Sequence, residues 1–470
     1  MVIPSLKSMP LVLAAIAGLV LFPSPGAYAV PSYARQTGQQ CVACHVSFPE
    51  LTPYGRYFKL TGYTIGQRQT LPFAVMGQVG MTRTKNNTGV VGVDPDTGDN
   101  ITGDVNPRNG GVVFSGGSVF LAGKATDNIG GFVQWTYNPL AADPNTNEFK
   151  GHGQLDNTDI RITGKYIGAG GQEPELIYGA TLHNNPTVQD VWNSTPAFGF
   201  PYTSSPLAQT PAVSTLIDGG LAQQVAGLGG YFFWKKTIYG ELSYYRTADG
   251  VFSALRAGQD TATPGGVSRL SGYNPYWRLA YNREWGSHSM MVGTYGMMVN
   301  KLPDNTIPGT PTDKFTDTAL DAQYQYITDP HTFTAQAAYI HEKQNWDASF
   351  ASVQQTGEGI GAGATPSVAS THLNTVKAKA TYYYLRKYGA TLAYVSTTGT
   401  SDAGLYGAQT ASPDSTAYVM ELNYLPIQNV RLMLQYTNYT KFNGASSNYD
   451  GNGRNAKDNN TLFLNAWFAF

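Results

Sequence analysis

Apolar and polar residues alternate along most of this chain, from Leu71 to the C-terminal Phe470. In one such run, Leu320, Ala322, Tyr324 and Tyr326 alternate with Asp321, Gln323 and Gln325. A period of two is that of a β-strand, because successive side chains point to opposite faces. A single strand of this kind also fits a half-buried soluble sheet. The number of strands and the lengths of their connections therefore decide the architecture.

Sixteen segments carry this pattern, and each is near the length that crosses a bilayer at a tilt. They are residues 71–84, 111–124, 129–138, 156–165, 173–182, 224–235, 237–246, 275–285, 287–298, 316–327, 331–341, 373–385, 388–397, 415–425, 428–439 and 460–470. The connections alternate between long polar loops and tight turns. This parity is typical of an outer-membrane β-barrel, whereas a soluble sandwich has no reason to keep it.

The two ends of the alternating region support the same interpretation. Its last residues alternate up to the terminal phenylalanine, which resembles the C-terminal assembly signal of bacterial outer-membrane barrels. Aromatic clusters at 231–234, 276–277 and 382–384 fit the girdles at the membrane interfaces. We therefore predict an all-β chain: a transmembrane antiparallel β-barrel of about 16 strands over residues 71–470. Long loops would be extracellular, and the N- and C-termini of the chain would lie in the periplasm.

Composition excludes several other classes of protein. Lys and Arg (30) nearly cancel Asp and Glu (31), and charged residues make up only 13%, so no basic face is available for nucleic acid. With 41% hydrophobic residues the chain can bury a core, which argues against disorder. After the N-terminus no run of about 18 apolar residues would make a spanning helix.

The N-terminus predicts export. Lys7 provides a basic start, residues 10–22 form an apolar core, and Ala27-Tyr28-Ala29 makes a cleavage site with small residues. A membrane anchor is the alternative, but the apolar stretch is too short to span comfortably. We expect residues 1–29 to be a cleaved signal peptide, and the outer membrane of a Gram-negative bacterium to be the destination.

The chain has two cysteines, in Cys41-Val42-Ala43-Cys44-His45. Cys-x-x-Cys-His is the attachment pattern of a c-type haem, in which both thiols join the vinyl groups and the histidine binds the iron. A thioredoxin-like pair would need a βαβ setting. A zinc site would need further ligands at metal spacing, and the other six histidines are scattered. We predict one covalent haem c on Cys41 and Cys44, with His45 as the proximal ligand of the haem iron.

A short helix is predicted after this motif. Thr52 can cap it, Pro53 suits its first position and Gly62 its end. Tyr54, Tyr57 and Phe58 would share one face and cover a porphyrin or pack on the rest of the protein. A segment of this size cannot enclose a haem alone. We therefore expect residues 30–70 to plug or line the periplasmic end of the barrel.

The N-terminal segment of the chain resembles a known family. Ala34 to Gly38, the haem motif, Phe48-Pro49-x-Leu51 and Gly55-Arg56-x-Phe58-Lys59 are similar to the fused outer-membrane monohaem cytochrome–porins of iron-oxidising bacteria. The remaining chain resembles the family only in architecture. Members take electrons from extracellular ferrous iron, Fe(II), and pass them through one haem to a periplasmic cytochrome or other electron carrier. The resemblance implies iron(II) oxidoreductase activity, haem attachment by Cys41, Cys44 and His45, and packing around the haem by the Phe-Pro and Gly-Arg positions.

Other features leave alternatives open. Met76, Met81 and His183 are weak candidates for the distal haem ligand, and the alternative for each is an ordinary residue of the barrel. Acidic residues in loops 85–110 and 342–372 could concentrate cations, but their spacing defines no iron site. His183 would open a long loop, 183–223, of the kind that folds into the lumen of porins. No seam in the sequence sets an oligomeric state.

Three functions compete on this basis. The first is an electron conduit that oxidises iron. The second is a diffusion porin in which the tethered haem is a structural plug or sensor. The third is a haem enzyme such as a peroxidase, for which distal acid and base groups are needed, and no His-Arg or His-Asn pairing announces them. The resemblance favours the first.

Overall fold

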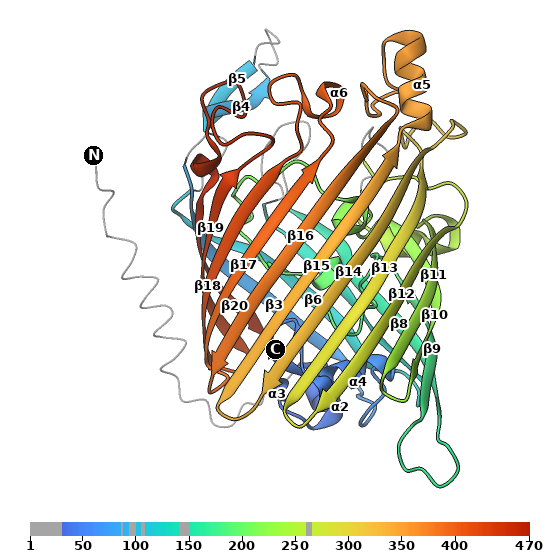
Figure 1. Ribbon diagram of the computed structural model, residues 1–470. Helices are drawn as coiled ribbons and strands as arrows, with labels where there is room; N and C mark the ends of the chain where they lie inside the picture. Colours follow the sequence, from blue (N-terminus) through green and yellow to red (C-terminus); the bar gives the residue numbers. More distant parts are fainter. Residues whose placement is uncertain (1–30, 86–87, 94–99, 105–108, 141–150, 260–265) are drawn as a thin grey trace.

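The computed structural model describes residues 31–85, 88–93, 100–104, 109–140, 151–259 and 266–470. Sixteen antiparallel strands pair edge to edge and close into one barrel (Figure 1). The last strand, β20, pairs with the first barrel strand, β3, and this pairing completes the ring. The predicted signal peptide, residues 1–29, lies outside the described residues.

All sixteen predicted strands are confirmed. The barrel strands are β3 (Phe73–Arg83), β6 (Val112–Lys124), β7 (Ile129–Asn138), β8 (His152–Tyr166), β9 (Leu176–His183), β10 (Val225–Trp234), β11 (Ile238–Thr247), β12 (Asn274–Trp285), β13 (His288–Lys301), β14 (Asp313–Ile327), β15 (His331–Asn345), β16 (Ser370–Tyr384), β17 (Tyr388–Gly399), β18 (Ser415–Ile427), β19 (Val430–Lys441) and β20 (Thr461–Ala469). Several extend a few residues beyond the predicted limits, because ladder pairing continues into the long loops.

Short turns join the strands at the end of the barrel where the C-terminus lies, and long connections join them at the other end. The long connections carry small elements that the sequence did not predict. These are the hairpin β4 (Thr88–Val93) with β5 (Asn100–Asp104), η3 (Gly250–Arg256), α5 (Asp347–Thr356), α6 (Ala403–Tyr406) and η4 (Ala456–Asn459). No helix among the described residues is long and apolar enough to span a membrane.

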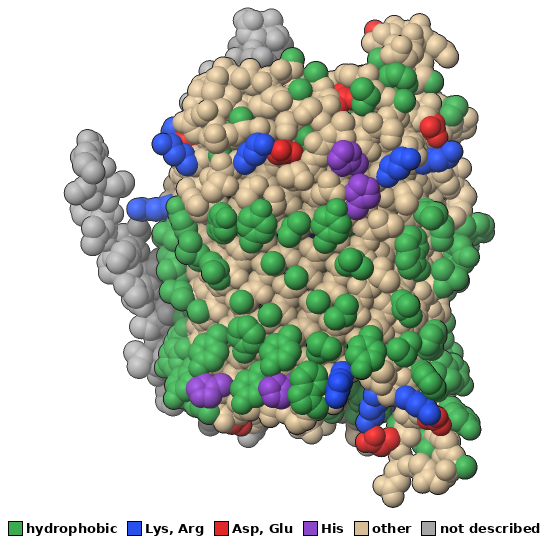
Figure 2. Space-filling view, viewed as in Figure 1, with side chains coloured by type: hydrophobic (Ala, Val, Ile, Leu, Met, Phe, Trp, Pro, Cys, Tyr) green, Lys and Arg blue, Asp and Glu red, His purple; other side chains and the backbone are tan. Residues whose placement is uncertain are grey.

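The alternation in the sequence separates the outer face from the lumen. Leu320 is 62% exposed on the outside, whereas Asp321, Gln323 and Gln325 are buried inside. Hydrophobic side chains form a belt around the visible outer face (Figure 2). Only alternate residues of the aromatic clusters face outward, as an interfacial girdle requires. In 231–234 and 382–384, Phe232, Trp234, Tyr382 and Tyr384 point outward, but Tyr231 and Tyr383 are buried, because a strand sends alternate residues inward.

Residues 31–72, here called the plug, lie at the end of the barrel where the short turns are (Figure 1). The plug contains α2 (Ser32–Thr37), α3 (Cys41–Cys44), β1 (His45–Ser47), β2 (Glu50–Leu51) and α4 (Pro53–Leu60). Its side chains bond to inward-facing residues of the wall, as Arg56 does to Ser289 and Gln325. The expectation of an N-terminal plug with a short helix is confirmed.

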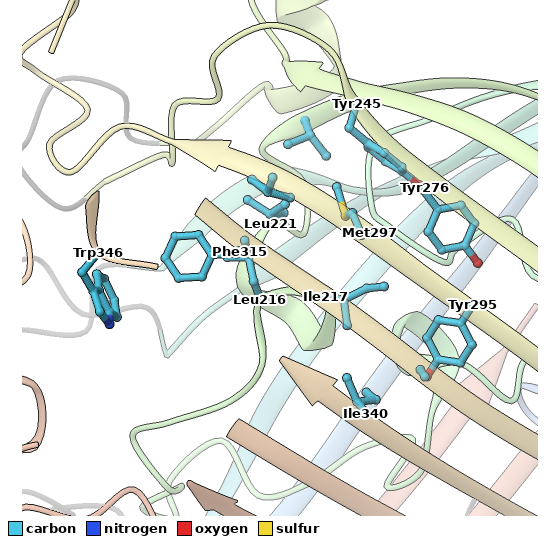
Figure 3. Close-up of a cluster of buried hydrophobic side chains, with 13 residues drawn as sticks. Leu216, Ile217, Leu221, Tyr245, Tyr276, Tyr295, Met297, Phe315, Ile340 and Trp346 are labelled. Atoms are coloured by element: carbon cyan, nitrogen blue, oxygen red, sulfur yellow. The ribbon is translucent and has the colours of Figure 1, made fainter. Parts of the chain in front are cut away.

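The connection 184–224, here called the inner loop, also folds into the lumen, as expected by analogy with porins. It contains η1 (Pro196–Phe198) and η2 (Leu216–Gly220). Leu216, Ile217 and Leu221 pack on inward-facing residues of the wall such as Tyr295 and Ile340 (Figure 3). The Leu216 amide donates to Glu342, so the tip of the loop is held on β15.

Candidate functional site

The Cys41–His45 motif occupies one helical turn and the residue after it. Cys41 and Cys44 are free, partly exposed thiols at the two ends of α3. Residues three apart in a helix share a side, so both sulfurs can face one flat group. His45 leaves the turn in extended conformation, with its amide bonded to the Cys41 carbonyl.

Thr52 and Gly55 hold α3 against α4. The Thr52 hydroxyl donates to the Ala43 carbonyl (2.5 Å) and accepts from the Gly55 amide (3.2 Å), so it caps α4 while binding the end of α3. The Thr52 amide donates to the Cys44 carbonyl at 2.9 Å. A Cβ at position 55 would collide with the Cys44 carbonyl oxygen. The predicted cap and first proline of this helix are therefore confirmed, and Gly62 follows its end with a positive φ of 68°.

Burial holds the motif in its neutral forms. The pKa of His45 falls to about 4, mainly because burial disfavours the imidazolium, against a smaller opposing effect of the Glu50 and Pro49 backbone. The pKa of Cys44 rises to about 11, through burial and the neighbouring Cys41. The Nδ1 atom of His45 is buried and has no hydrogen-bond partner among the described residues. The ring packs edge-on against Phe48, with centroids 5.8 Å apart.

These properties fit a covalently attached haem. The attachment needs two thiols on one turn, and iron binds the neutral imidazole. A buried ring nitrogen without a partner is costly unless another group satisfies it. Among the described residues, no group of three or more His, Cys, Asp or Glu side chains could hold a metal ion.

The aromatic residues of α4 divide between two environments. Tyr54 lies beside Cys44, and burial together with that thiol raises the pKa of Tyr54. Phe58 is buried between Tyr33 and Tyr63, with ring centroids 4.9 Å and 5.8 Å away. Tyr57 joins the buried cluster around Leu60. Of the three aromatics expected to share one face, only Tyr54 is placed to cover a group on Cys44.

Arg56 and Lys59 fasten the plug to the wall and to the inner loop. Arg56 donates to Gln325 (2.5 Å) and Ser289 (2.5 Å) on the wall. Lys59 donates to the Val188 carbonyl (2.7 Å), the Asp190 carbonyl (2.6 Å) and the Asn193 amide oxygen (2.9 Å) of the inner loop. Burial, and next the nearby Arg161, lower the pKa of Lys59 to about 7.

A buried ion pair fastens the other side of the plug. Glu50 is 1% exposed and pairs with Lys379 on β16, and the Tyr202 hydroxyl of the inner loop donates to Glu50 at 3.0 Å. Burial alone would raise the pKa of Glu50, but the Lys379 ammonium and its hydrogen bonds bring that pKa below its usual value. Arg431 on β19 donates to the Phe48 carbonyl at 2.8 Å.

The inner loop is itself pinned to the wall by charge. Arg278 on β12 pairs with Asp190 (3.2 Å) and with Asp321 on β14 (2.8 Å), and all three side chains are fully buried. Sequence reasoning missed these anchors. In the sequence, each anchor was visible only as a charged residue at an inward-facing position of a strand. The alternation of residues does not show which group that charge contacts.

The proposed distal ligands fare differently. Met81 is wrong: it pairs with the outward-facing Leu464 and so points away from the lumen. His183 ends β9 rather than opening the loop, and its Nε2 and Nδ1 atoms bond to Tyr245 (2.5 Å) and Thr181 (3.2 Å). Its role as a ligand stays a prediction. Met76 pairs with the buried Ser118 and faces the lumen, so it stays a candidate.

In the parts of the acidic loops that the structure describes, no group of three or more possible metal ligands is found. In loop 85–110, Asp94, Asp96 and Asp99 lie outside the described residues. Glu342, counted in the sequence as part of a mildly acidic loop, is instead a buried residue of β15 that binds the inner loop. The sequence missed this because the ladder of β15 extends four residues beyond the predicted end.

No protein-family model matches the chain, and no curated protein matches its sequence. Solved structures similar in fold include the outer membrane channel DcaP of Acinetobacter baumannii, at 12% identity over 85% of this chain and 96% of that chain, with a TM-score of 0.42. OmpF of Salmonella typhi in complex with daunomycin has 13% identity over 85% and 97%, with a TM-score of 0.45. OmpT of Vibrio cholerae has 9% identity over 85% and 97%, with a TM-score of 0.40. These structures are similar to this chain in fold alone.

Proposed function

We propose that this protein is an outer-membrane electron-transfer protein with one haem c bound through Cys41 and Cys44. In this proposal it takes electrons from extracellular Fe(II) and delivers them to a periplasmic cytochrome or another carrier. The observation that carries the proposal is the Cys-x-x-Cys-His turn on a plug fastened inside a barrel. A bilayer core of about 30 Å separates the electron donor from the acceptor, so a conduit needs a redox group held inside the barrel.

The bound haem supplies one-electron exchange at its iron. The chain supplies position and protection. His45, held neutral by burial, is ready to bind iron without losing a proton. Thr52 and Gly55 fix the turn that carries the thiols. Arg56, Lys59 and Glu50 fix that turn relative to the wall, which sets the distance of the redox group from each face.

The membrane orientation follows from the two ends of the barrel. The apolar outer belt suits a lipid environment. In outer-membrane barrels short turns face the periplasm and long loops the exterior, so the plug would lie on the periplasmic side. An electron acceptor would then approach the plug end, and ferrous iron the end with the long loops.

The test is anaerobic stopped-flow absorbance of the oxidised, haem-loaded protein mixed with ferrous iron. We expect the reduced α and Soret bands to grow, as each ferrous ion gives up one electron. Cys41→Ala and Cys44→Ala should each impair haem attachment. Cys41→Ser also lacks the thiol but keeps a polar side chain of similar size. If it is expressed as well as the wild type yet carries less haem, the loss is one of attachment and not of folding. A haem that stays oxidised with ferrous iron but is reduced by dithionite would refute iron as the donor.

A second candidate function is a diffusion channel with a structural or sensory haem. It is favoured by the fold, since similar solved structures include one described as an outer membrane channel, and by the polar side chains along the lumen. Single-channel conductance in planar bilayers distinguishes the two. A channel conducts with the plug in place, whereas a conduit conducts ions only after contacts such as Glu50–Lys379 are removed.

A further inference from the structure

A group of basic side chains lies on the outer face of the barrel, directly above the apolar belt. Figure 2 shows histidine, lysine and arginine side chains, with a few acidic ones beside them, in a band above the hydrophobic side chains at the end with the long loops. We name the group of His341, Lys343 and His372, with Lys314 at its edge, the outer basic cluster.

Strand register brings these side chains together. Lys343 on β15 pairs with His372 on β16, and the rings of His341 and His372 lie 6.0 Å apart. Their sequence neighbours Glu342 and Gln344 are buried in the lumen, so His341 and Lys343 point outward. Lys343 and His372 are both exposed.

Few carboxylates oppose this charge. Lys314 pairs with Asp347 at 3.1 Å. Within the described part of the chain, His341, Lys343 and His372 have no ion pair with a carboxylate. At the opposite boundary, by contrast, Lys235, Lys236 and Arg386 each have an acidic partner, as the salt bridges to Glu175, Glu173 and Asp329 show.

The histidine geometry leaves donors for an anion. The Thr400 hydroxyl oxygen accepts the His372 amide at 3.1 Å, so its proton can go to His372 Nδ1, 2.7 Å away. That arrangement places the ring proton of His372 on Nε2. The Nε2–H group and the Lys343 ammonium can then donate to the same anion.

The level of the cluster identifies the kind of anion. Tyr339, two residues before His341 on β15, is 42% exposed, and Leu320 on β14 is 62% exposed, so the apolar belt ends just below the cluster. Cations at this height meet the headgroups rather than the acyl chains. In the outer leaflet of an outer membrane, the phosphates at this depth belong to lipid A, the glycolipid that anchors lipopolysaccharide.

We propose that the outer basic cluster is a binding site for a lipid A phosphate. The site rests on the proposed outer-membrane location and orientation, and it is independent of the haem. It would hold lipopolysaccharide against strands β14 to β16, beside the long connections that carry α5.

Native mass spectrometry of the purified full-length protein in neutral detergent tests the proposal, with bisphosphorylated lipid A as the probe. We expect Lys343→Gln with His372→Gln to weaken binding about tenfold or more, because the two substitutions remove one surface cation and one hydrogen bond to the phosphate. Lipid A without phosphate should bind the wild type and the variant equally weakly. Lys387→Gln, an exposed lysine at the opposite boundary, is the matched control and should leave affinity unchanged.

Equal binding of bisphosphorylated lipid A to the wild type and the double variant would overturn the site. Phosphatidylglycerol binding as tightly as lipid A would overturn the assignment to the glycolipid. If the double variant folds poorly, Lys343→Gln alone decides, since its side chain is exposed. Haem absorbance of the same samples reports on the proposed function separately.

Discussion

The barrel wall and the plug are stabilised by different interactions. In the wall, every strand bonds along its length to two neighbours, as β14 does to β13 and β15. The helices of the plug have at most eight residues, as in α4, and are too short to be stable alone. Buried polar contacts hold the plug instead: Arg56 and Lys59 through hydrogen bonds, and Glu50 through its ion pair with Lys379.

This difference predicts different responses to mutation. An outward-facing residue of the wall contacts lipid, so apolar side chains can replace one another there at little cost. In the plug, buried Glu50 pairs with the Lys379 ammonium, and losing that partner leaves an uncompensated ion away from water. Substitutions in the plug should therefore have large effects on stability that stay within the plug. The effect of a substitution on the outer face of the wall should depend on the polarity of the new side chain.

The largest effect is expected from Lys379→Met, which removes the cation beside buried Glu50. Docking of the plug should weaken by about 3–5 kcal/mol. Amide hydrogen exchange of residues 41–60 should accelerate, while exchange in β14 stays unchanged. The double variant Glu50→Gln with Lys379→Met leaves neither charge and should lose much less. Equal losses in the single and double variants would show that the charges do not hold the plug.

Lys59 should make plug docking depend on pH. Its pKa is about 7 in the folded protein, against an ordinary value of 10.5, because burial disfavours the ammonium. Between these values the unfolded segment binds more protons, so stability rises with pH, by roughly 3 kcal/mol from pH 7 to about pH 9. Below about pH 7 this contribution is constant. Exchange of α4 amides, corrected for intrinsic rates, measures it, and Lys59→Met should lack the dependence. The same pH profile in both proteins would contradict it.

Leu320→Arg tests the wall. The substitution puts a charge on the outer face of β14, between the middle and the upper edge of the apolar belt. It should cost about 2 kcal/mol in reversible folding into phospholipid vesicles, less than at the bilayer centre and more than at the interface. Urea titration followed by tryptophan fluorescence measures this. Leu320→Met is the matched control and should cost little. If arginine is tolerated as well as methionine, this face does not contact lipid.

The smallest effect is expected from Gly55→Ala, where the new Cβ meets the Cys44 carbonyl oxygen. Separating α3 from α4 should cost about 1–3 kcal/mol, despite the better helix propensity of alanine. Exchange of the α3 and α4 amides reports it. At Gly230 on β10 the nearest atom to a new Cβ is 3.6 Å away, so Gly230→Ala is the control. Equal behaviour of the two alanines would show that the helices tolerate separation.

The sequence by itself determined the barrel. A period of two and the parity of the connections depend only on neighbours along the chain, so all sixteen strands could be located before any contact was known. It also determined the capped start of α4, because Thr52-Pro53 acts through local hydrogen bonds. The Cys41–His45 motif, too, is a local pattern, and its interpretation as a haem site stays a prediction.

Only the tertiary structure decided how the lumen is filled and what each inward residue binds. Arg56 reaches residues 233 and 269 positions away, and Lys379 reaches back 329 positions to Glu50. Alternation places such side chains inside but cannot choose their partners, because a partner depends on barrel closure and on where the inner loop folds. For the same reason Met81 and His183 looked available as ligands in the sequence, while the folded wall turns one outward and bonds both ring nitrogens of the other.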